Sequence, residues 1–338
     1  MIRKYVVGLT LLIFVILPTI TIGQLLQEES EVDHQSLGTL AKEIFATMQK
    51  IREASGFGPV HANGIVCLGT FVATQNAIAL SSAVHFDTTP VPITVRFSDG
   101  TLNPSIFDNS PDGGPRGMAI RFHLPEGAKT DLLVISHNGF IVGSGKEFLE
   151  LQTAIASTDR SKDHPWPIEQ FLKTHPRAEK FIQDNKIIPA SFATESFFSN
   201  NAFIFVNKNG LRQAGRYKIL PIAGKQNLSD AQAKSKTFGF LFQELKSRLL
   251  AGPIKYRLIV QLPNPGDPTS DPSIVWPENR RTIYVGIINI NSVVLDKEVA
   301  EKALAFDPVN LTDGIETSDD SLPDLISLVQ LLSVMSSN

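Results

Sequence analysis

Short runs of β-type residues, separated by Gly, Pro and Asp, constrain the fold of this 338-residue chain more than any other feature. They fall into two blocks: residues 69–73, 92–97, 116–123 and 131–135, and then residues 202–206, 217–221, 256–262 and 282–290. Strands of this number and length predict a closed or nearly closed antiparallel barrel. No internal repeat or low-complexity linker divides the chain, so we expect one domain over residues 30–338.

Apolar residues at helical spacing predict helices around this barrel. Residues 36–54 form an amphipathic pattern that ends at Ser55-Gly56, and residues 230–251 form a second long one. Shorter patterns lie between the two strand blocks, and residues 320–335 predict a closing helix. The expected fold class is therefore α+β, a barrel with surrounding helices.

The N-terminal segment has the layout of an export signal. Arg3 and Lys4 are followed by an apolar run from Tyr5 to Ile22, and small residues precede a plausible cleavage point after Gly23. An uncleaved membrane anchor is the alternative, because the run approaches spanning length. Both interpretations place the rest of the chain across a membrane, in the periplasm or another extracytoplasmic space.

Composition excludes several classes of function. Lys and Arg total 31 against 34 Asp and Glu, so the formal charge is −3 and we expect no nucleic-acid partner. The single cysteine, Cys67, excludes an intramolecular disulfide and a thiolate-rich metal site. No protein-ligated metal site is predicted. The sequence also lacks the Gly-x-Ser-x-Gly, Gly-Lys-Ser/Thr and His-Glu-x-x-His motifs.

The histidines are the remaining candidates for chemistry, and His61 stands just before a Gly-rich strand. Taken alone, a histidine in this position is more often structural than catalytic. Arg96 and Arg121 are equally consistent with surface or inter-strand charge pairs, and Ser98 with a turn cap before Asp99-Gly100.

Several stretches in unbroken order change that assessment. They are HANGIVCLGTFVAT, VRFSDG, PRGMAIRFHLP, NGFIVGSGKEFLE, RYKILPIAG and LPNPGDPTSDPSIVWP, and they span most of the chain after the N-terminal segment. In these motifs the chain resembles the catalase-related peroxidases, small single-domain enzymes that share the haem-catalase core. The resemblance implies a catalase-type closed antiparallel barrel and haem as the cofactor.

The resemblance also implies roles for individual residues. His61 matches the distal histidine, which carries a proton between the two oxygens of a peroxide. Ser98 matches the serine that steadies this histidine. Arg96 matches the cation that meets a haem propionate, and Val60 and Phe97 would form apolar walls of the distal pocket.

The last helix departs from the family pattern. The family holds haem iron through a tyrosinate on this helix, with an arginine four residues earlier that lowers the pKa of the phenol. Here Gln330 stands at the tyrosine position and Ile326 at the arginine position, and residues 321–338 contain no Tyr, Arg, His or Cys. A neutral amide is a weak ligand for ferric iron.

Two functions follow from these observations. The first is an exported haem peroxidase that reduces hydrogen peroxide or organic peroxides in oxidative-stress defence, with an unidentified electron donor as its second partner. The second is a catalase-fold protein that has lost haem ligation and serves as a pseudoenzyme or ligand-binding protein. Assembly into a homo-oligomer is compatible with either function.

Overall fold

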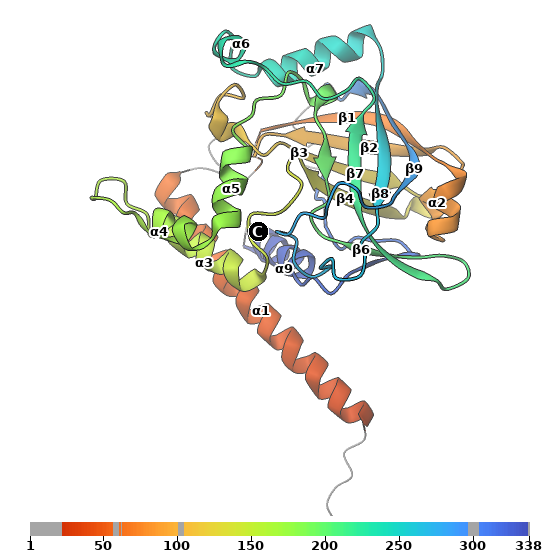
Figure 1. The fold of residues 1–338 in the computed structure, drawn as a ribbon, viewed down its shortest axis with the longest axis horizontal. Helices are drawn as coiled ribbons and strands as arrows, with labels where there is room; N and C mark the ends of the chain where they lie inside the picture. Colours follow the sequence, from red (N-terminus) through yellow and green to blue (C-terminus); the bar gives the residue numbers. More distant parts are fainter. Residues whose placement is uncertain (1–21, 57–60, 62, 101–104, 297–303, 337–338) are drawn as a thin grey trace, which may run out of the picture.

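A closed antiparallel β-barrel forms the centre of the protein (Figure 1). In the computed structural model, residues 22–56, 61, 63–100, 105–296 and 304–336 are described, with side chains from Ser36 onward. The barrel strands pair in the order β7-β5-β4-β3-β2-β1-β9-β8, and β8 pairs with β7 to close the ring. β6 and β10 extend the sheet from β7. The predicted closed barrel of the α+β class is therefore confirmed.

All eight predicted strands are present, although β1 and β7 each begin five residues earlier than the sequence patterns indicated. The strands are β1 (Gly64–Ala73), β2 (Val91–Ser98), β3 (Gly117–His123), β4 (Lys129–Ile135), β5 (Phe197–Phe198), β6 (Phe203–Val206), β7 (Arg212–Pro221), β8 (Ile254–Gln261), β9 (Thr282–Val293) and β10 (Ile315–Thr317). The sequence patterns did not predict β5 and β10, which are only two and three residues long. Strands that short leave no readable alternation of apolar and polar residues.

Helices cover the outside of the barrel (Figure 1). They are α1 (Ile22–Ser55), α2 (Gln75–Leu80), α3 (Gly145–Ala156), α4 (Pro167–Thr174), α5 (Pro176–Asp184), α6 (Asp230–Lys234), α7 (Phe240–Ala251) and α9 (Leu322–Met335). Helices α3, α4 and α5 lie on one side of the barrel and α6 and α7 on another. α1 ends at Ser55 as predicted.

The continuous helix predicted over residues 230–251 is wrong. The chain leaves the helical conformation after α6, and Gly239 has the left-handed backbone (φ 76°) immediately before α7. The Asp108 carboxylate accepts hydrogen bonds from the backbone N–H groups of Gly239 and Leu241, at 2.6 and 2.8 Å. This cap comes from a residue more than a hundred positions earlier, so local periodicity could not reveal where α7 begins.

The predicted export segment, residues 1–23, lies outside the described residues except for Ile22 and Gly23, which begin α1. Within the described part of the chain, no helix combines the length and the apolar character needed to cross a membrane.

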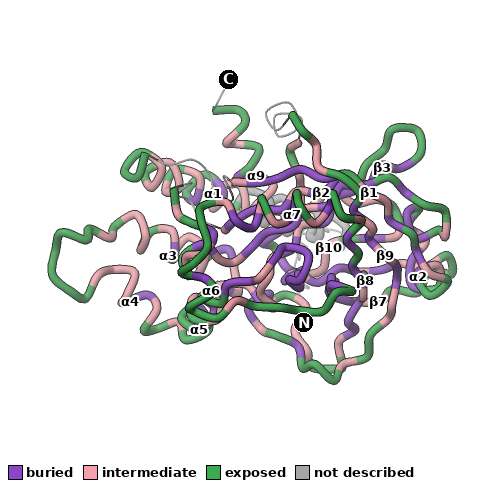
Figure 2. Tube along the Cα trace, turned by 90° about the horizontal axis from the view of Figure 1, so that it is seen from above, coloured by how far each residue is buried: buried purple, intermediate pink, exposed green. Residues whose placement is uncertain are grey.

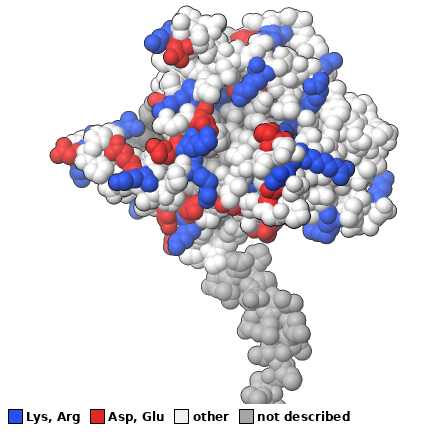
Figure 3. Space-filling model, in the orientation of Figure 1, with Lys and Arg blue, Asp and Glu red and all other residues white. Residues whose placement is uncertain are grey.

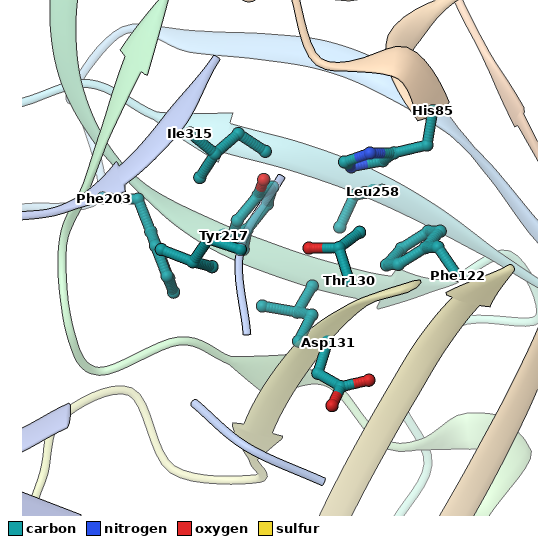
Figure 4. Close-up of a pocket in the computed structure, with 10 residues that line it drawn as sticks. His85, Phe122, Thr130, Asp131, Phe203, Tyr217, Leu258 and Ile315 are labelled. Atoms are coloured by element: carbon teal, nitrogen blue, oxygen red, sulfur yellow. The ribbon is translucent and has the colours of Figure 1, made fainter. Parts of the chain in front are cut away.

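The barrel interior is apolar and holds one unusual polar side chain. His85 is buried among Phe71, Phe86 and Phe122, and no described residue forms a hydrogen bond with its Nδ1. A cavity of about 10 Å³ lies beside it, also lined by Thr130 and Tyr217 (Figure 4). A space of this size holds about one water molecule. Figure 2 shows how the buried residues follow the barrel strands while the outer helices carry exposed residues.

A second apolar cluster joins α9 to α1 and α3. Leu325 of α9 is fully buried, packs with Ala41 and Ile44 of α1, and approaches Gly145 at the start of α3. The apolar spacing in residues 320–335 predicted this helix, and its buried side serves to hold α1 and α3 together.

Because Leu325 is buried within this cluster, we predict that Leu325→Ala lowers the free energy of unfolding by about 2–5 kcal/mol. Leu331→Ala on the same helix is the matched control. Leu331 is 57% exposed, and its truncation should change stability by less than about 0.5 kcal/mol. Urea titration followed by circular dichroism measures both, and equal effects for the two variants would contradict the described orientation of α9.

Candidate functional site

The alternation of side chains along β2 separates the residues that were predicted to act together. Arg96 and Ser98 lie on the outer face of the sheet, and Phe97 between them lies on the inner face. The Phe97 ring is fully buried in the barrel core and stacks on Phe192, with ring centroids 5.2 Å apart. The expectation that Phe97 forms a wall beside His61 is therefore corrected, because neighbouring residues of a strand point to opposite faces.

His61 reaches this outer face from the turn before β1. Its Nδ1 lies 3.0 Å from Ser98 Oγ, and its backbone carbonyl accepts a hydrogen bond of 2.9 Å from Arg96 Nη2. The His61 backbone has φ 62°, in the left-handed region that non-glycine residues rarely adopt. Such strain persists only where surrounding contacts hold it, and it is typical of functional sites.

Gly117 of β3 makes room for the imidazole. Gly117 pairs with Ser98 across the β2–β3 ladder, so a side chain there would stand on the same face. A Cβ atom on Gly117 would lie 2.6 Å from Ser98 Oγ and 2.9 Å from His61 Nδ1. The next paired residue, Ile135 of β4, presents an apolar side chain on that face. The His61–Ser98 pair therefore depends on a glycine at the first position of β3.

Burial and nearby cations keep the His61 imidazole neutral. Desolvation, followed by the positive charge of Arg96, lowers the pKa of His61 from 6.5 to about 4, with a smaller contribution from Arg116 and against a hydrogen bond to the Asp99 backbone that raises it. The imidazole is thus uncharged throughout the physiological pH range, which is the form that accepts a proton.

A buried ion pair supports the end of β2 behind this site. Arg116 Nη1 lies 3.1 Å from Asp99 Oδ1, and both side chains are almost fully buried. Arg116 also donates to the backbone carbonyls of Gly113 and Asp108, the second at 2.6 Å. Burial raises the pKa of Asp99 to about 6, although Arg116 opposes that shift. These contacts fix the backbone next to Ser98 and link it to Asp108, which caps α7.

The last helix, α9, offers no axial ligand, as its sequence indicated. Gln330 is exposed on α9 and Ile326 is half-buried. α9 contains no Tyr, His, Cys, Lys or Arg, and among the described residues no group of His, Cys, Asp and Glu could hold a metal ion. The distal side thus fits haem, through His61, Ser98 and Arg96, but the α9 side does not fit iron ligation.

The structure therefore brings together His61, Ser98 and Arg96, and it does not bring Phe97 to them. Val60 lies outside the described residues. Sequence reasoning missed the roles of Gly117, Asp99 and Arg116. A glycine inside a predicted strand is a recognised indication of close approach, whereas nothing in the local sequence pairs Asp99 with Arg116.

Known proteins similar to this chain point to one family. A family model described as Catalase matches residues 47–325. The chain is 35% identical over 291 residues to a protein named Catalase-related peroxidase from Mycolicibacterium paratuberculosis, covering 84% of this chain and 91% of that protein. A second protein of that name, from Synechococcus elongatus, is 29% identical over 276 residues, covering 81% of each chain.

A solved structure shows the same fold. The crystal structure of a fungal catalase superposes with a TM-score of 0.70 at 19% identity, covering 81% of this chain and 57% of the fungal chain. The barrel and its helices are therefore those of the catalase fold.

We predict that His61 titrates with a pKa of about 4 in a histidine NMR titration of the folded protein. Arg96→Gln should raise that pKa, because it removes a positive charge that disfavours the imidazolium. Arg212→Gln, which breaks an exposed ion pair with Glu316, is the control and should leave it unchanged. A His61 pKa near 6.5 in the wild type would show that the imidazole is not buried at this site.

Proposed function

We propose that this protein, which belongs to the catalase family, reduces peroxides at the His61–Ser98 pair. The observation that carries the proposal is the 3.0 Å contact between Ser98 Oγ and His61 Nδ1, made by an imidazole that is neutral at physiological pH. The two relatives named Catalase-related peroxidase support the same class of substrate. Hydrogen peroxide and organic hydroperoxides both carry the proton that such an imidazole accepts.

The proton chemistry follows from the position of His61. Ser98 holds Nδ1, which leaves Nε2 as the nitrogen that can meet a peroxide. Nε2 accepts the proton of the hydroperoxide O–H group and returns it to the leaving oxygen, which then departs as water or an alcohol rather than as an anion. Burial and Arg96 destabilise the imidazolium formed in between, and this favours the return of the proton.

The oxygen atom that remains when the O–O bond breaks takes up two electrons, and two protons from solvent, and becomes water, so the reduction as a whole consumes two electrons and two protons. His61 serves proton transfer only, so the electrons come from a donor that is a separate partner in this proposal. Catalase-family proteins generally bind haem, and haem would supply the redox chemistry. Arg96 on the outer face of β2 would meet a propionate of that group.

A second candidate function is favoured by α9. Its residues supply no axial ligand and no cation to polarise one, so a catalase-fold protein without redox catalysis fits this side of the molecule better. In that case the His61 face binds a ligand without turning it over.

We further propose, from residues 1–23, that the protein acts outside the cytoplasm. With peroxide reduction as its function, it would protect against oxidative stress there.

For the first function, we predict that His61→Ala lowers peroxide turnover by about 10²–10⁴-fold, the usual contribution of a positioned acid–base group, with haem content unchanged. His164→Ala is the matched control, since His164 is exposed and paired with Glu169 far from β2. Turnover is followed by peroxide consumption with a reducing dye present, after haem is added to the purified protein. Full turnover in His61→Ala would remove His61 from the mechanism.

We predict that Gln330→Tyr combined with Ile326→Arg increases haem affinity. Residues four apart lie on one helical face, so the pair restores an anionic ligand with its cation one turn away. Leu331→Tyr with Ile326→Arg is the control, because it adds the same side chains but displaces the phenol to a neighbouring face. Haem titration followed in the visible spectrum measures the change. Equal affinities for both double variants would show that Gln330 does not face the cofactor position.

A further inference from the structure

Residues of α7 and of the strands β1 and β9 line a groove. In Figure 1, α7 lies above the barrel at the top of the view. The volume of the groove is about 640 Å³, within the range of sites that bind small organic molecules. Apolar side chains from both walls dominate its lining: Phe238, Phe242, Leu249, Leu250, Val293 and Leu295.

Several apolar side chains in this groove are exposed to solvent. Leu250 is 90% exposed, Leu295 96% and Phe238 47%. At one end, Phe238 packs edge-to-face on Phe107, which is itself 51% exposed, with ring centroids 5.3 Å apart. Contiguous exposed apolar surface of this kind indicates a binding site.

One cation stands in this apolar groove. Lys246 of α7 is the only charged side chain among its described lining residues. Glu244 and Arg248, the acidic and basic neighbours of Lys246 on α7, pair with each other at 2.6 Å. Lys246 has no ion pair within the described chain. On the face that Figure 3 shows, charges of both signs are interspersed. The Lys246 ammonium group beside an apolar groove therefore complements a ligand that has one anionic group and an apolar chain.

The groove also adjoins the His61 site. Gly64 and Val66 belong to its floor, and across the β1–β2 ladder they pair with Ser98 and Arg96. Paired residues share a face of the sheet, so the floor of the groove continues into the outer face that carries Ser98 and Arg96.

We propose that the α7 groove is a binding site for a single-chain anionic amphiphile of the fatty-acid type. The acyl chain lies against the apolar walls, and the carboxylate lies at Lys246. One cation matches one negative charge, and the concave volume suits one flexible chain. This site is separate from the peroxide chemistry at His61, so neither proposal depends on the other.

The test compares three ligands that share a twelve-carbon chain and differ only in their head group. Dodecanoate, dodecanol and dodecyltrimethylammonium are titrated into the full protein below their micellar concentrations by calorimetry, without peroxide or haem. We expect saturable binding of one dodecanoate per chain, weaker binding of the alcohol and the weakest of the cation. Absence of saturable dodecanoate binding, or tighter binding of the cation, would overturn the proposal.

Two sets of variants locate the ligand. Lys246→Gln should weaken dodecanoate binding roughly three- to fivefold, the size of one solvent-accessible ion pair, and leave dodecanol binding unchanged. Lys234→Gln is the matched control, because Lys234 is exposed at the end of α6 and does not line the groove. Equal dodecanoate affinity in Lys246→Gln and the wild type would contradict the assignment of the carboxylate.

The second set uses Leu250, whose exposure makes it safe to replace. Leu250→Glu and Leu250→Lys remove the same apolar group, and the glutamate variant should bind dodecanoate more weakly than the lysine variant. Sedimentation of the wild type and Leu250→Glu accompanies the titrations. A dimer that Leu250→Glu dissociates would assign the groove to a second copy of the chain and overturn the amphiphile proposal.

Discussion

The contact of the His61 imidazole with the bare backbone of Gly117 is the constraint on which the site depends. Only a glycine at this position of β3 leaves room for the ring against the sheet, and only then does Nδ1 come within hydrogen-bond distance of Ser98. The same arrangement leaves His61 only partly exposed and brings Arg96 to its backbone carbonyl. The position of the His61 imidazole and its protonation state therefore both depend on the pairing of β2 with β3.

The two sides of the proposed cofactor position differ in the side chains that they offer. The β2–β3 face keeps a histidine, a serine and an arginine in defined contact, supported from behind by the buried Asp99–Arg116 pair. α9 contributes leucines to the α1–α3 cluster and supplies no ligand for iron. The fold thus needs only the apolar packing of α9. Iron ligation of the family type needs a tyrosine and an arginine on this helix as well. The family fold and the contacts of His61 with Ser98 and Arg96 are thus present together, whereas α9 offers no axial ligand.

Much of the fold could be predicted from the sequence, because period-two runs bounded by Gly and Pro specify strands locally. The short strands β5 and β10 and the start of α7 could not, since pairing partners or a distant Asp108 cap define them. At the site, the structure places His61, Ser98 and Arg96, the residues that the resemblance indicated, in contact with one another. The resemblance misplaced Phe97, although alternation along β2 already puts that residue on the face opposite Ser98. The Asp99–Arg116 ion pair could not be predicted from the sequence, because the burial of both charges is a property of the tertiary structure.

The most direct test of this account is the pH dependence of kcat/KM for peroxide reduction by the haem-supplemented wild-type protein. In the proposed function His61 acts as a neutral base, and its pKa is lowered to about 4. Activity should therefore stay constant from neutral pH down to about 5 and fall with unit slope only as pH drops through about 4. A decline centred near 6.5, the ordinary histidine value, would contradict the buried neutral imidazole, and the absence of turnover at every pH would contradict the peroxide function itself.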